Sequence, residues 1–180
     1  KYNKPNEVFL GSPHRIDRPT SGIILFAKTS KALTRLNKMF LEKSIQKTYW
    51  AIVKNKPTKN EEKLTHYLKK NQQKNKSFTS DNETKGAKKA ELYFKIIHHF
   101  SNYYLLEIKP LTGRHHQIRV QLAAIACPIK GDLKYGFPRS NADASISLHA
   151  RKIEFIHPVK KIPITIIAPP NIKDVLWKEA

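Results

Sequence analysis

The side chain best suited to chemistry is the carboxylate of Asp17, which lies between two arginines in the segment HRIDRPTSG at residues 14–22. Nearby positive charge favours the ionised form of a carboxylate, so we expect this acid to be charged. Pro19 fixes its own backbone angle, and Gly22 allows a conformation that most residues resist. Such a turn can hold one acidic oxygen at the mouth of a sheet. Alternatively, Asp17 caps the turn and pairs with a neighbouring arginine.

Two other places hold candidate reactive groups, Tyr49 and the segment RHHQIR at residues 114–119. The sequence has no Gly-rich phosphate loop, no G-x-S-x-G elbow and no pair of carboxylates of the glycosidase type. The histidines at 98–99 and at 115–116 are adjacent in sequence, so the two side chains of a pair do not face a common metal. We therefore predict that the chain has no metal site.

The charge of the chain indicates a polyanionic partner. Its 34 Lys and Arg residues stand against 14 Asp and Glu residues, which gives a formal net charge of +20. Single domains this basic usually bind phosphate backbones, so nucleic acid is the expected partner. An anionic membrane surface is an alternative partner, for which no basic amphipathic helix is found, and a codon bias toward Lys could account for part of the charge.

The composition is that of a globular protein in a reducing compartment. Of the 180 residues, 39% are hydrophobic and 27% charged, which suits one large domain with its own core. No segment approaches the ~20 apolar residues of a membrane helix. The single cysteine, Cys127, excludes an internal disulfide and fits the cytoplasm, which is the predicted location.

The elements that would position the candidate residues follow from hydrophobic periodicity and turn residues. In the first half of the chain we predict an irregular segment at 1–13, a buried strand at 23–28, a helix from 30 to about 43, a strand at 47–53, and a loop or frayed hairpin at 55–89 with a short strand at 64–68. In the second half we predict an antiparallel pair of strands at 90–98 and 103–108, followed by a helix from about 114 that ends before residue 128. A loop at 130–136, strands at 146–156 and 162–167, and a closing helix at 173–178 complete the prediction. Ser30 is the predicted N-cap of the first helix. Tyr49 and Trp50 should point to opposite faces of their strand. The fold class is therefore α+β, with a mixed, mainly antiparallel sheet and flanking helices.

Five segments of the chain resemble motifs of the RluA-type RNA pseudouridine synthases. HRIDRPTSG at 14–22 resembles HRLD-x-x-TSG, KTYWA at 47–51 resembles K-x-Y-x-A, LTGRHHQIRV at 111–120 resembles TGR-x-HQIRV, PIKGDLKYG at 128–136 resembles P-I-x-GD-x-x-YG, and SLHA at 147–150 with FIHP at 155–158 resembles the closing LHA…F-x-HP. One such motif would be weak evidence. Five in the family's order are strong evidence.

The resemblance implies the pseudouridine synthase catalytic fold and the isomerisation of specific uridines to pseudouridine in structured ribosomal or transfer RNA, with no cofactor. Enzymes that act on a base extrude the nucleotide into a pocket. By resemblance, Asp17 is the nucleophile or base, Arg119 is its guanidinium partner, and Tyr49 lies against the uracil. The attack on the base, the attack on the ribose and the abstraction of a ribose proton all stay open.

Further residues are expected to contact the RNA. These are His14, Arg15, Arg114, His116, Gln117, Lys130 and Leu148. Leu148 would pack under the base, and Arg15 would fill the gap left by the extruded base or hold a phosphate. Arg114 and Lys130 would contact the RNA backbone.

The chain departs from the family pattern at two places. The family normally opens with a strand carrying K-P-x-G well upstream of the HRLD turn, and Lys4-Pro5 is too close to Asp17 to belong to it. We therefore expect residues 1–180 to form one catalytic domain with a trimmed N-terminus and no S4 domain, acting as a monomer. His115 stands at the rim of the site, where the family usually has Thr.

Two alternative functions compete with this interpretation. The first is a non-catalytic RNA-binding module that keeps the synthase fold and its charge. The second is an RNA-cleaving enzyme that uses His115 or His116 as acid and base.

Overall fold

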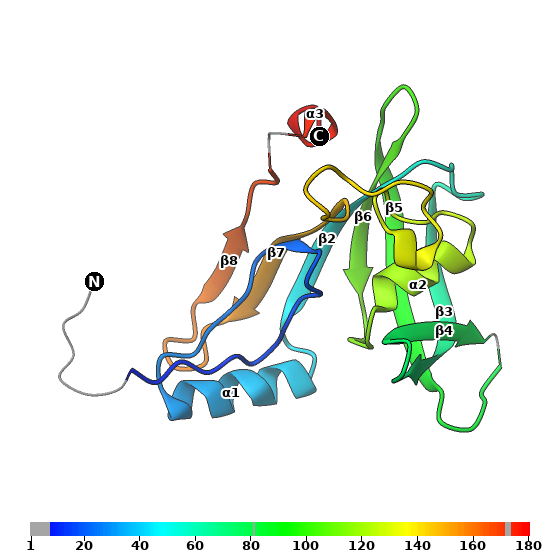
Figure 1. Ribbon diagram of the computed structural model, residues 1–180. Coiled ribbons are helices and arrows are strands. Elements are labelled where there is room, and N and C mark those ends of the chain that lie inside the picture. The colour runs from blue at the N-terminus through cyan, green and yellow to red at the C-terminus, as the bar shows by residue number, and fades with distance from the viewer. Residues whose placement is uncertain (1–7, 81, 172–173) are drawn as a thin grey trace.

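The computed structural model describes residues 8–80, 82–171 and 174–180 and contains an eight-stranded sheet with short helices (Figure 1). Residues 1–7 of the predicted irregular segment, and Lys173 at the start of the predicted closing helix, lie outside the described residues. The strands are β1 (Ser21–Gly22), β2 (Gln46–Val53), β3 (Glu61–Asn71), β4 (Lys76–Ser80), β5 (Lys88–His99), β6 (Tyr104–Pro110), β7 (Leu148–Ile156) and β8 (Pro163–Ile167). The helices are α1 (Ser30–Leu41), α2 (Gln117–Ala124), the 3-10 turn η1 (Leu133–Tyr135) and α3 (Val175–Lys178).

The sheet has the order β1-β7-β2-β6-β5-β3-β4, and β8 also pairs with β7. The β1–β7 pair is parallel and the other pairs are antiparallel. The predicted class, a mixed and mainly antiparallel sheet with few helices, is confirmed. No helix among the described residues is long and apolar enough to cross a membrane.

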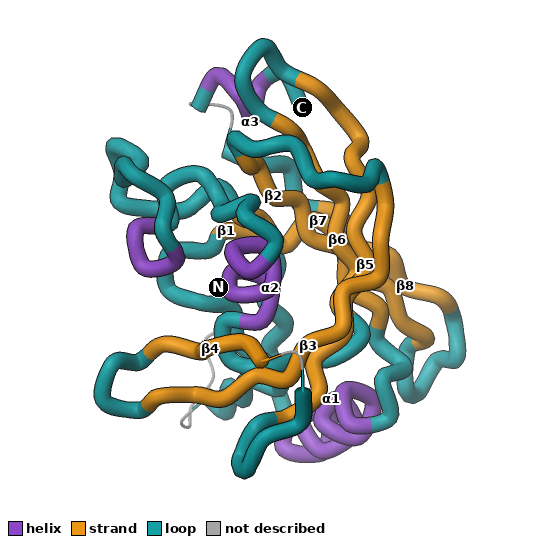
Figure 2. The backbone as a smooth tube through the Cα atoms, turned by 90° about the vertical axis from the view of Figure 1, so that its right-hand side faces the viewer, coloured by secondary structure: helices purple, strands orange, loops and turns teal. Residues whose placement is uncertain are grey.

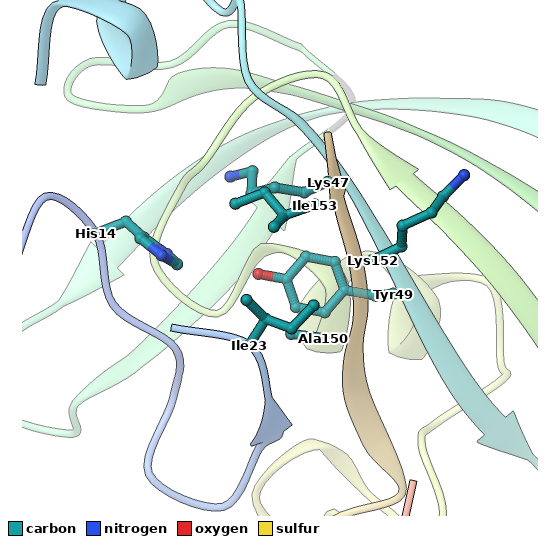
Figure 3. Close-up of a pocket in the computed structure, with 7 residues that line it drawn as sticks. All are labelled: His14, Ile23, Lys47, Tyr49, Ala150, Lys152 and Ile153. Carbon is teal, nitrogen blue, oxygen red and sulfur yellow. The ribbon is translucent and has the colours of Figure 1, made fainter. Parts of the chain in front are cut away.

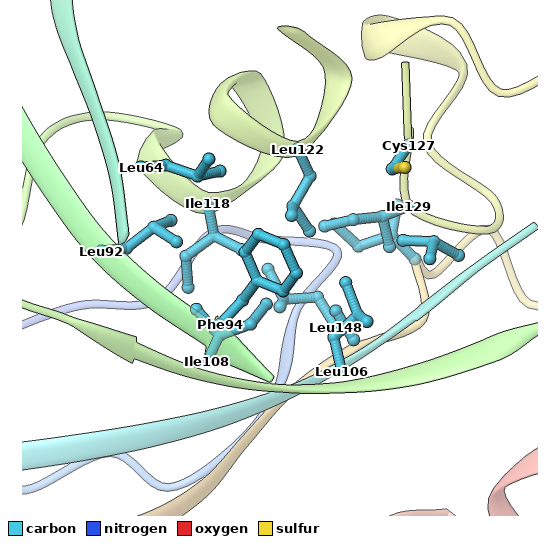
Figure 4. Packing of buried hydrophobic residues seen from close by; sticks show 13 residues of the cluster. Leu64, Leu92, Phe94, Leu106, Ile108, Ile118, Leu122, Cys127, Ile129 and Leu148 are labelled. Atoms are coloured by element: carbon cyan, nitrogen blue, oxygen red, sulfur yellow. The ribbon is translucent and has the colours of Figure 1, made fainter. Parts of the chain in front are cut away.

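The main core lies between α2 and one face of the sheet (Figures 2 and 4). Alternate residues of β2, β5 and β6 point to α2, because side chains alternate along a strand. Ile118 and Leu122 of α2 pack on Phe94, and this core continues to Ile129 and Leu148. Apolar burial therefore fixes α2 on the sheet.

The opposite face of the sheet carries a smaller cluster. Ile52 and Leu105 pack there against Trp177 of α3, with Trp50 at the margin. Tyr49 instead packs against the main core, so the prediction that Tyr49 and Trp50 point to opposite faces is confirmed.

The predicted buried strand at 23–28 is wrong. Ser21 and Gly22 pair with β7, and the N–H of Ile23 still donates to the Ala150 carbonyl at 3.0 Å. The chain then leaves the sheet and makes a single bridge between Ala27 and Gly11. Ile24 and Phe26 are exposed. The apolar run looks like a strand by composition alone, but its backbone is held by loop contacts rather than by a neighbouring strand.

The segment at 55–89 is more ordered than predicted. It contains β3, which pairs with β5 over eight residues from Glu61 to Leu68, and β4, which folds back on β3. The hairpin alternative is thus confirmed and the loop alternative is wrong. Of β3, only Leu64 and Leu68 are buried, and most of its polar residues face solvent, so the composition resembles that of a loop.

The remaining differences are small shifts of boundaries. The N-cap of α1 is Thr29, whose Oγ1 accepts a hydrogen bond from the N–H of Ala32 at 3.1 Å, and not Ser30. α2 begins at Gln117 rather than near Arg114, because His116 has a left-handed backbone with φ 53°. The predicted strands at 47–53, 90–98, 103–108, 146–156 and 162–167 correspond to β2, β5, β6, β7 and β8.

Candidate active site

The loop that carries Asp17 is attached to β7 by contacts between two distant segments. The Ser21 hydroxyl lies 2.8 Å from Nδ1 of His149, and Gly22 passes so close to β7 that an added Cβ would lie 2.4 Å from the Ala150 carbonyl oxygen. Gly22 also has φ +112°, which favours glycine. These contacts explain why a Ser-Gly pair follows the acid, since a larger residue could not approach β7 in this way.

His14 closes the other side of the same loop. Its Nε2 accepts a hydrogen bond from the N–H of Leu25 at 2.9 Å, and its ring packs on Phe40 of α1 at 4.8 Å between centroids. Burial, together with the charge of Lys47, lowers the pKa of His14 to about 4, so the ring is neutral at pH 7. His14 therefore shapes the loop around Asp17.

Asp17 and Arg119 are in contact, although they are 102 positions apart in the sequence. Nη1 of Arg119 donates to Oδ2 of Asp17 at 3.3 Å. The side chain of Asp17 is 27% exposed and that of Arg119 only 5%. Within the described residues, no protein side chain donates to Oδ1 of Asp17, so this oxygen is open to a ligand in the cleft.

Asp132 is a site residue that the sequence reasoning missed. Its two carboxylate oxygens accept hydrogen bonds from Nε and Nη2 of Arg119, at 2.7 and 2.8 Å, and its side chain is 1% exposed. Burial alone would lower the pKa of Arg119, but the contacts with Asp132 and Asp17 outweigh this and raise it. The signal that could have found Asp132 is the GD pair in the segment at 128–136, which resembles a family motif but was given no role for its acid.

His116 lies next to Asp17 and is held there by hydrogen bonds to other residues. The hydroxyl of Tyr135 accepts a bond from the N–H of Ser77 at 2.9 Å and lies 2.9 Å from Nδ1 of His116. The hydroxyl can then donate to Nδ1, which leaves the ring proton on Nε2, 3.8 Å from Oδ2 of Asp17. Burial lowers the pKa of His116 to about 4, although Asp17 acts in the opposite direction. His116 is thus neutral at pH 7 and is a dipolar neighbour of Asp17.

Tyr49 of β2 stands across from these groups. Burial, and secondarily the charge of Asp17, raises the pKa of Tyr49 to about 12, so its hydroxyl is protonated at neutral pH. Figure 3 shows this hydroxyl pointing toward His14 in a small recess beside Lys47 and Ile23. Tyr49 also lines the larger cleft that adjoins this recess.

One cleft of about 1050 Å³ joins nearly all of the predicted site residues. It is lined by Asp17, Tyr49, Arg119, His14, Arg15, Arg114, His116, Gln117 and Leu148. Six Lys or Arg side chains and three carboxylates line it in total, so the cleft is positively charged. Such a cleft suits an anionic ligand much larger than a single metabolite.

Two side chains predicted to contact RNA instead form hydrogen bonds within the protein. Lys130 does not line this cleft, and its ammonium binds Asp174 at 3.1 Å and the side chain of Asn141 at 2.9 Å. Gln117 is buried and uses its amide within the protein, where its oxygen accepts from Thr112 and its nitrogen donates to the Glu91 carbonyl. Gln117 therefore shapes the wall of the cleft.

Arg114 is exposed, with its Nε donating to the Lys89 carbonyl at 3.1 Å. Its remaining donors face solvent at the mouth of the cleft, as does the exposed side chain of Arg15. Both residues therefore remain predicted RNA contacts. Among the residues that the structure describes, no three His, Cys, Asp or Glu side chains are grouped as ligands for a metal.

Comparison with known proteins gives consistent results. A model of the family described as RNA pseudouridylate synthase matches residues 1–124. The ribosomal large subunit pseudouridine synthase C of Vibrio vulnificus (strain CMCP6) is 37% identical over 172 residues, which is 92% of this chain and 53% of the relative. The protein of the same name from Buchnera aphidicola subsp. Schizaphis graminum (strain Sg) is 38% identical over 178 residues, covering 94% of this chain and 56% of the relative. The chain thus spans about half the length of the curated relatives it matches.

Two solved structures share the fold. Human RNA Pseudouridylate Synthase Domain Containing 4 superposes with a TM-score of 0.78 at 21% identity, over 94% of this chain and 75% of the other. Human RNA Pseudouridylate Synthase Domain Containing 1 superposes with a TM-score of 0.73 at 23% identity, over 90% of this chain and 69% of the other. At these identities the superpositions establish the fold alone.

Proposed function

Since the chain belongs to the RNA pseudouridylate synthase family, we propose that it isomerises uridine to pseudouridine within RNA, with Asp17 as the reacting acid. The observation that carries the proposal is the contact between Asp17 and Arg119 inside a positively charged cleft. This contact joins two segments that resemble separate family motifs. It is the arrangement that a carboxylate needs if it is to stay ionised away from water.

The reaction breaks the glycosidic carbon–nitrogen bond of a uridine and forms a carbon–carbon bond to the same ribose, and a proton passes from the newly bonded ring carbon to the freed ring nitrogen. No atom is gained or lost. Asp17 would act through its open Oδ1 as nucleophile or as base, while Arg119 holds Oδ2. Asp132, through its two bonds to Arg119, would keep the guanidinium in the orientation that Asp17 requires.

The nucleotide would enter the cleft by leaving its stack in the RNA. Tyr49 would lie against the uracil, and its protonated hydroxyl offers a donor to the base. Leu148 is buried and lines the same cleft, which supports its packing under the base. Arg15 and Arg114, at the mouth, would contact the RNA backbone around the extruded nucleotide.

Ribosomal RNA is the proposed substrate class. The relatives at 37% and 38% identity are named as ribosomal large subunit synthases. We extend that substrate to this chain as part of the proposal, since the chain covers about half of each relative.

The test is to map pseudouridine across total RNA from cells with the protein, without it, and with the Asp17→Asn variant. We expect modified uridines in large-subunit RNA only with the unchanged protein, and RNA binding by Asp17→Asn within about threefold of it, because the cationic cleft is retained. Persistent RNA binding with no pseudouridine in any RNA would indicate the binding module instead. Shortened RNA on a gel would indicate the cleaving enzyme, because isomerisation leaves the chain length unchanged.

A further inference from the structure

Lys47 is a cation of the cleft to which neither the family comparison nor the catalytic proposal assigns a role. It lies on β2 two residues before Tyr49, so both side chains point to the same face, about 7 Å apart along the strand. Both line the cleft that contains Asp17, and Figure 3 shows Lys47 beside Tyr49 and His14. Lys47 is therefore within one nucleotide's length of Tyr49 and lines the same cleft as Asp17.

The ammonium of Lys47 lies between two uncharged walls. Nζ is 5.8 Å from the centroid of the Phe40 ring on α1. A Cβ built on Gly113, in the loop after β6, would lie 3.9 Å from Nζ. The cation thus spans the cleft between α1 and the loop that leads to α2.

Every carboxylate that lines this cleft is paired with a different cation. Asp17 binds Arg119 at 3.3 Å. Glu91 binds Lys63 and Lys89 at 2.7 and 3.3 Å, and Glu154 binds Lys152 at 2.9 Å. Within the described part of the chain, no ion pair includes Lys47.

The neighbouring His14 does not balance this charge, since the ring is neutral at pH 7 and accepts a bond from Leu25. Burial also lowers the pKa of Lys47, which reflects its partial removal from water. A desolvated ammonium without a counter-ion costs free energy that an incoming anion recovers. This point of the cleft therefore favours a ligand with a negative charge.

We propose that Lys47 forms a phosphate subsite that binds a backbone phosphate next to the nucleotide lying against Tyr49. This inference rests on the proposed function, because it takes RNA as the ligand. Each nucleotide brings one phosphate, and Lys binds it as a point charge without the planar fork that Arg offers. Lys47 thereby fixes how deeply the nucleotide enters the cleft, while Arg119 stays hydrogen-bonded to Asp17 and Asp132.

The experiment measures binding of a short single-stranded RNA, one uridine among adenosines, as salt rises from about 50 to 200 mM. Lys47→Met should weaken binding about tenfold, the usual worth of a charge-assisted hydrogen bond. It should also make the slope of log K against log salt less steep by about 0.7, the value for one phosphate contact on a single strand. Lys47→Arg, which keeps the charge, and Lys160→Met, which removes an exposed lysine of the β7–β8 turn, should both stay near the unchanged protein.

A change in the RNA provides a test that does not depend on the folding of a variant. Neutral methylphosphonates replace the two linkages that flank the uridine, one at a time. The unchanged protein should lose about tenfold affinity at one of them, and Lys47→Met should lose nothing more at that linkage. The inference is overturned if the unchanged protein binds RNA with a methylphosphonate at either linkage equally well. It is also overturned if Lys47→Met has the same salt slope as the unchanged protein.

The two proposals fail in different ways. If mapping finds no pseudouridine while binding still depends on Lys47 and one linkage, the subsite stands and the catalytic proposal falls. If pseudouridine forms but Lys47→Met binds RNA like Lys160→Met, the subsite falls and the catalytic proposal stands.

Discussion

At the scale of single residues, Arg119 is shared unequally between two carboxylates. Two bonds of 2.7 and 2.8 Å bind it to the buried Asp132, whereas one bond of 3.3 Å reaches the more exposed Asp17. The shorter, bidentate pair is the structural one, because a buried arginine needs a fixed counter-ion. The longer bond leaves Asp17 partly free, as a reacting group requires.

This inequality predicts that two matching substitutions change stability by different amounts. Asp132→Asn removes the buried negative charge that pairs with the guanidinium of Arg119. We therefore expect the free energy of unfolding, measured in urea, to fall by about 3 kcal/mol. Asp17→Asn, at a partly exposed pair, should change it by less than about 1 kcal/mol while isomerisation is lost. A stability loss for Asp17→Asn as large as that for Asp132→Asn would contradict the unequal sharing.

The neutral His116 predicts how stability changes with pH. Its pKa is about 4 in the folded protein because of burial, and close to 6.5 in the unfolded chain. As pH falls from about 6.5 to 4, the unfolded state takes up the proton first, so folding stability decreases through this window. His116 contributes about 3 kcal/mol to the decrease.

His116→Asn isolates this contribution, since Asn tolerates the left-handed backbone at φ 53°. Urea unfolding at pH 7 and at pH 4.5 should give a smaller pH effect for the variant than for the unchanged protein. The groups around the ring, which are Asp17, Arg119, His115 and Lys134, are present in both proteins, so the difference between them reports His116 together with its electrostatic coupling to these groups. An equal pH effect in both would show that His116 is not the group responsible.

At the scale of elements, the site depends on segments that contribute almost no regular structure. β1 has only two residues, yet it attaches the loop of Asp17 to β7. The β3–β4 hairpin, in turn, reaches the site through Ser77 and Tyr135. The loop of Asp17 is therefore attached to β7 by a very short strand, while the hairpin holds the Tyr135 hydroxyl beside His116.

Substitutions at two glycines with left-handed backbones allow two effects on stability to be separated. One is the steric contact of an added Cβ with the neighbouring strand, and the other is the strain of the backbone angle itself. Gly22 has φ +112° and would place a Cβ 2.4 Å from the Ala150 carbonyl oxygen, whereas Gly136 has φ +97° and nothing within 4 Å. Gly136→Ala should therefore cost about 1 kcal/mol of stability, from the angle alone. Gly22→Ala should cost about 3 kcal/mol and displace Asp17, with at least about a hundredfold loss of activity.

Thermal melting and rate measurements on both variants check this. If Gly22→Ala behaved like Gly136→Ala in both respects, the contact between β1 and β7 would not be what positions the acid.

At the scale of the whole molecule, charge is the dominant property. The formal net charge is +20, and exposed ion pairs such as that between Lys38 and Glu42 contribute little to stability. Six of the Lys and Arg residues line the cleft that contains Asp17, against three carboxylates, so part of the positive charge lies around this acid.

We expect RNA affinity to fall by at least about a hundredfold between 50 and 200 mM salt, because each neutralised phosphate releases counter-ions. Anionic lipid vesicles should bind much more weakly at the same salt, since no described helix is both amphipathic and long. Titrations of both ligands over the same salt range test this. Vesicle binding as tight as RNA binding would favour a membrane surface as the partner.

The amino-acid sequence by itself determined which residues are chemically competent and most of the regular elements. The alternating patterns of β2, β5, β6 and β7 report burial on one face, and this information is local. The local pattern was wrong at residues 23–28, where an apolar run is held by loop contacts. At β3 it predicted only the short strand at 64–68, because the polar residues that flank it resemble those of a loop.

The family resemblance implied that Arg119 is the partner of Asp17, but only the tertiary structure shows the contact and the other residues that join it. Asp17 and Arg119 are 102 positions apart, and the sheet order β1-β7-β2-β6-β5-β3-β4 brings their elements together. The same long-range pairing selected Asp132 as the partner of Arg119 and turned Lys130 away toward Asp174. Contacts of this kind depend on chain topology and on the burial of charge, and neither can be read from the periodicity of a local segment.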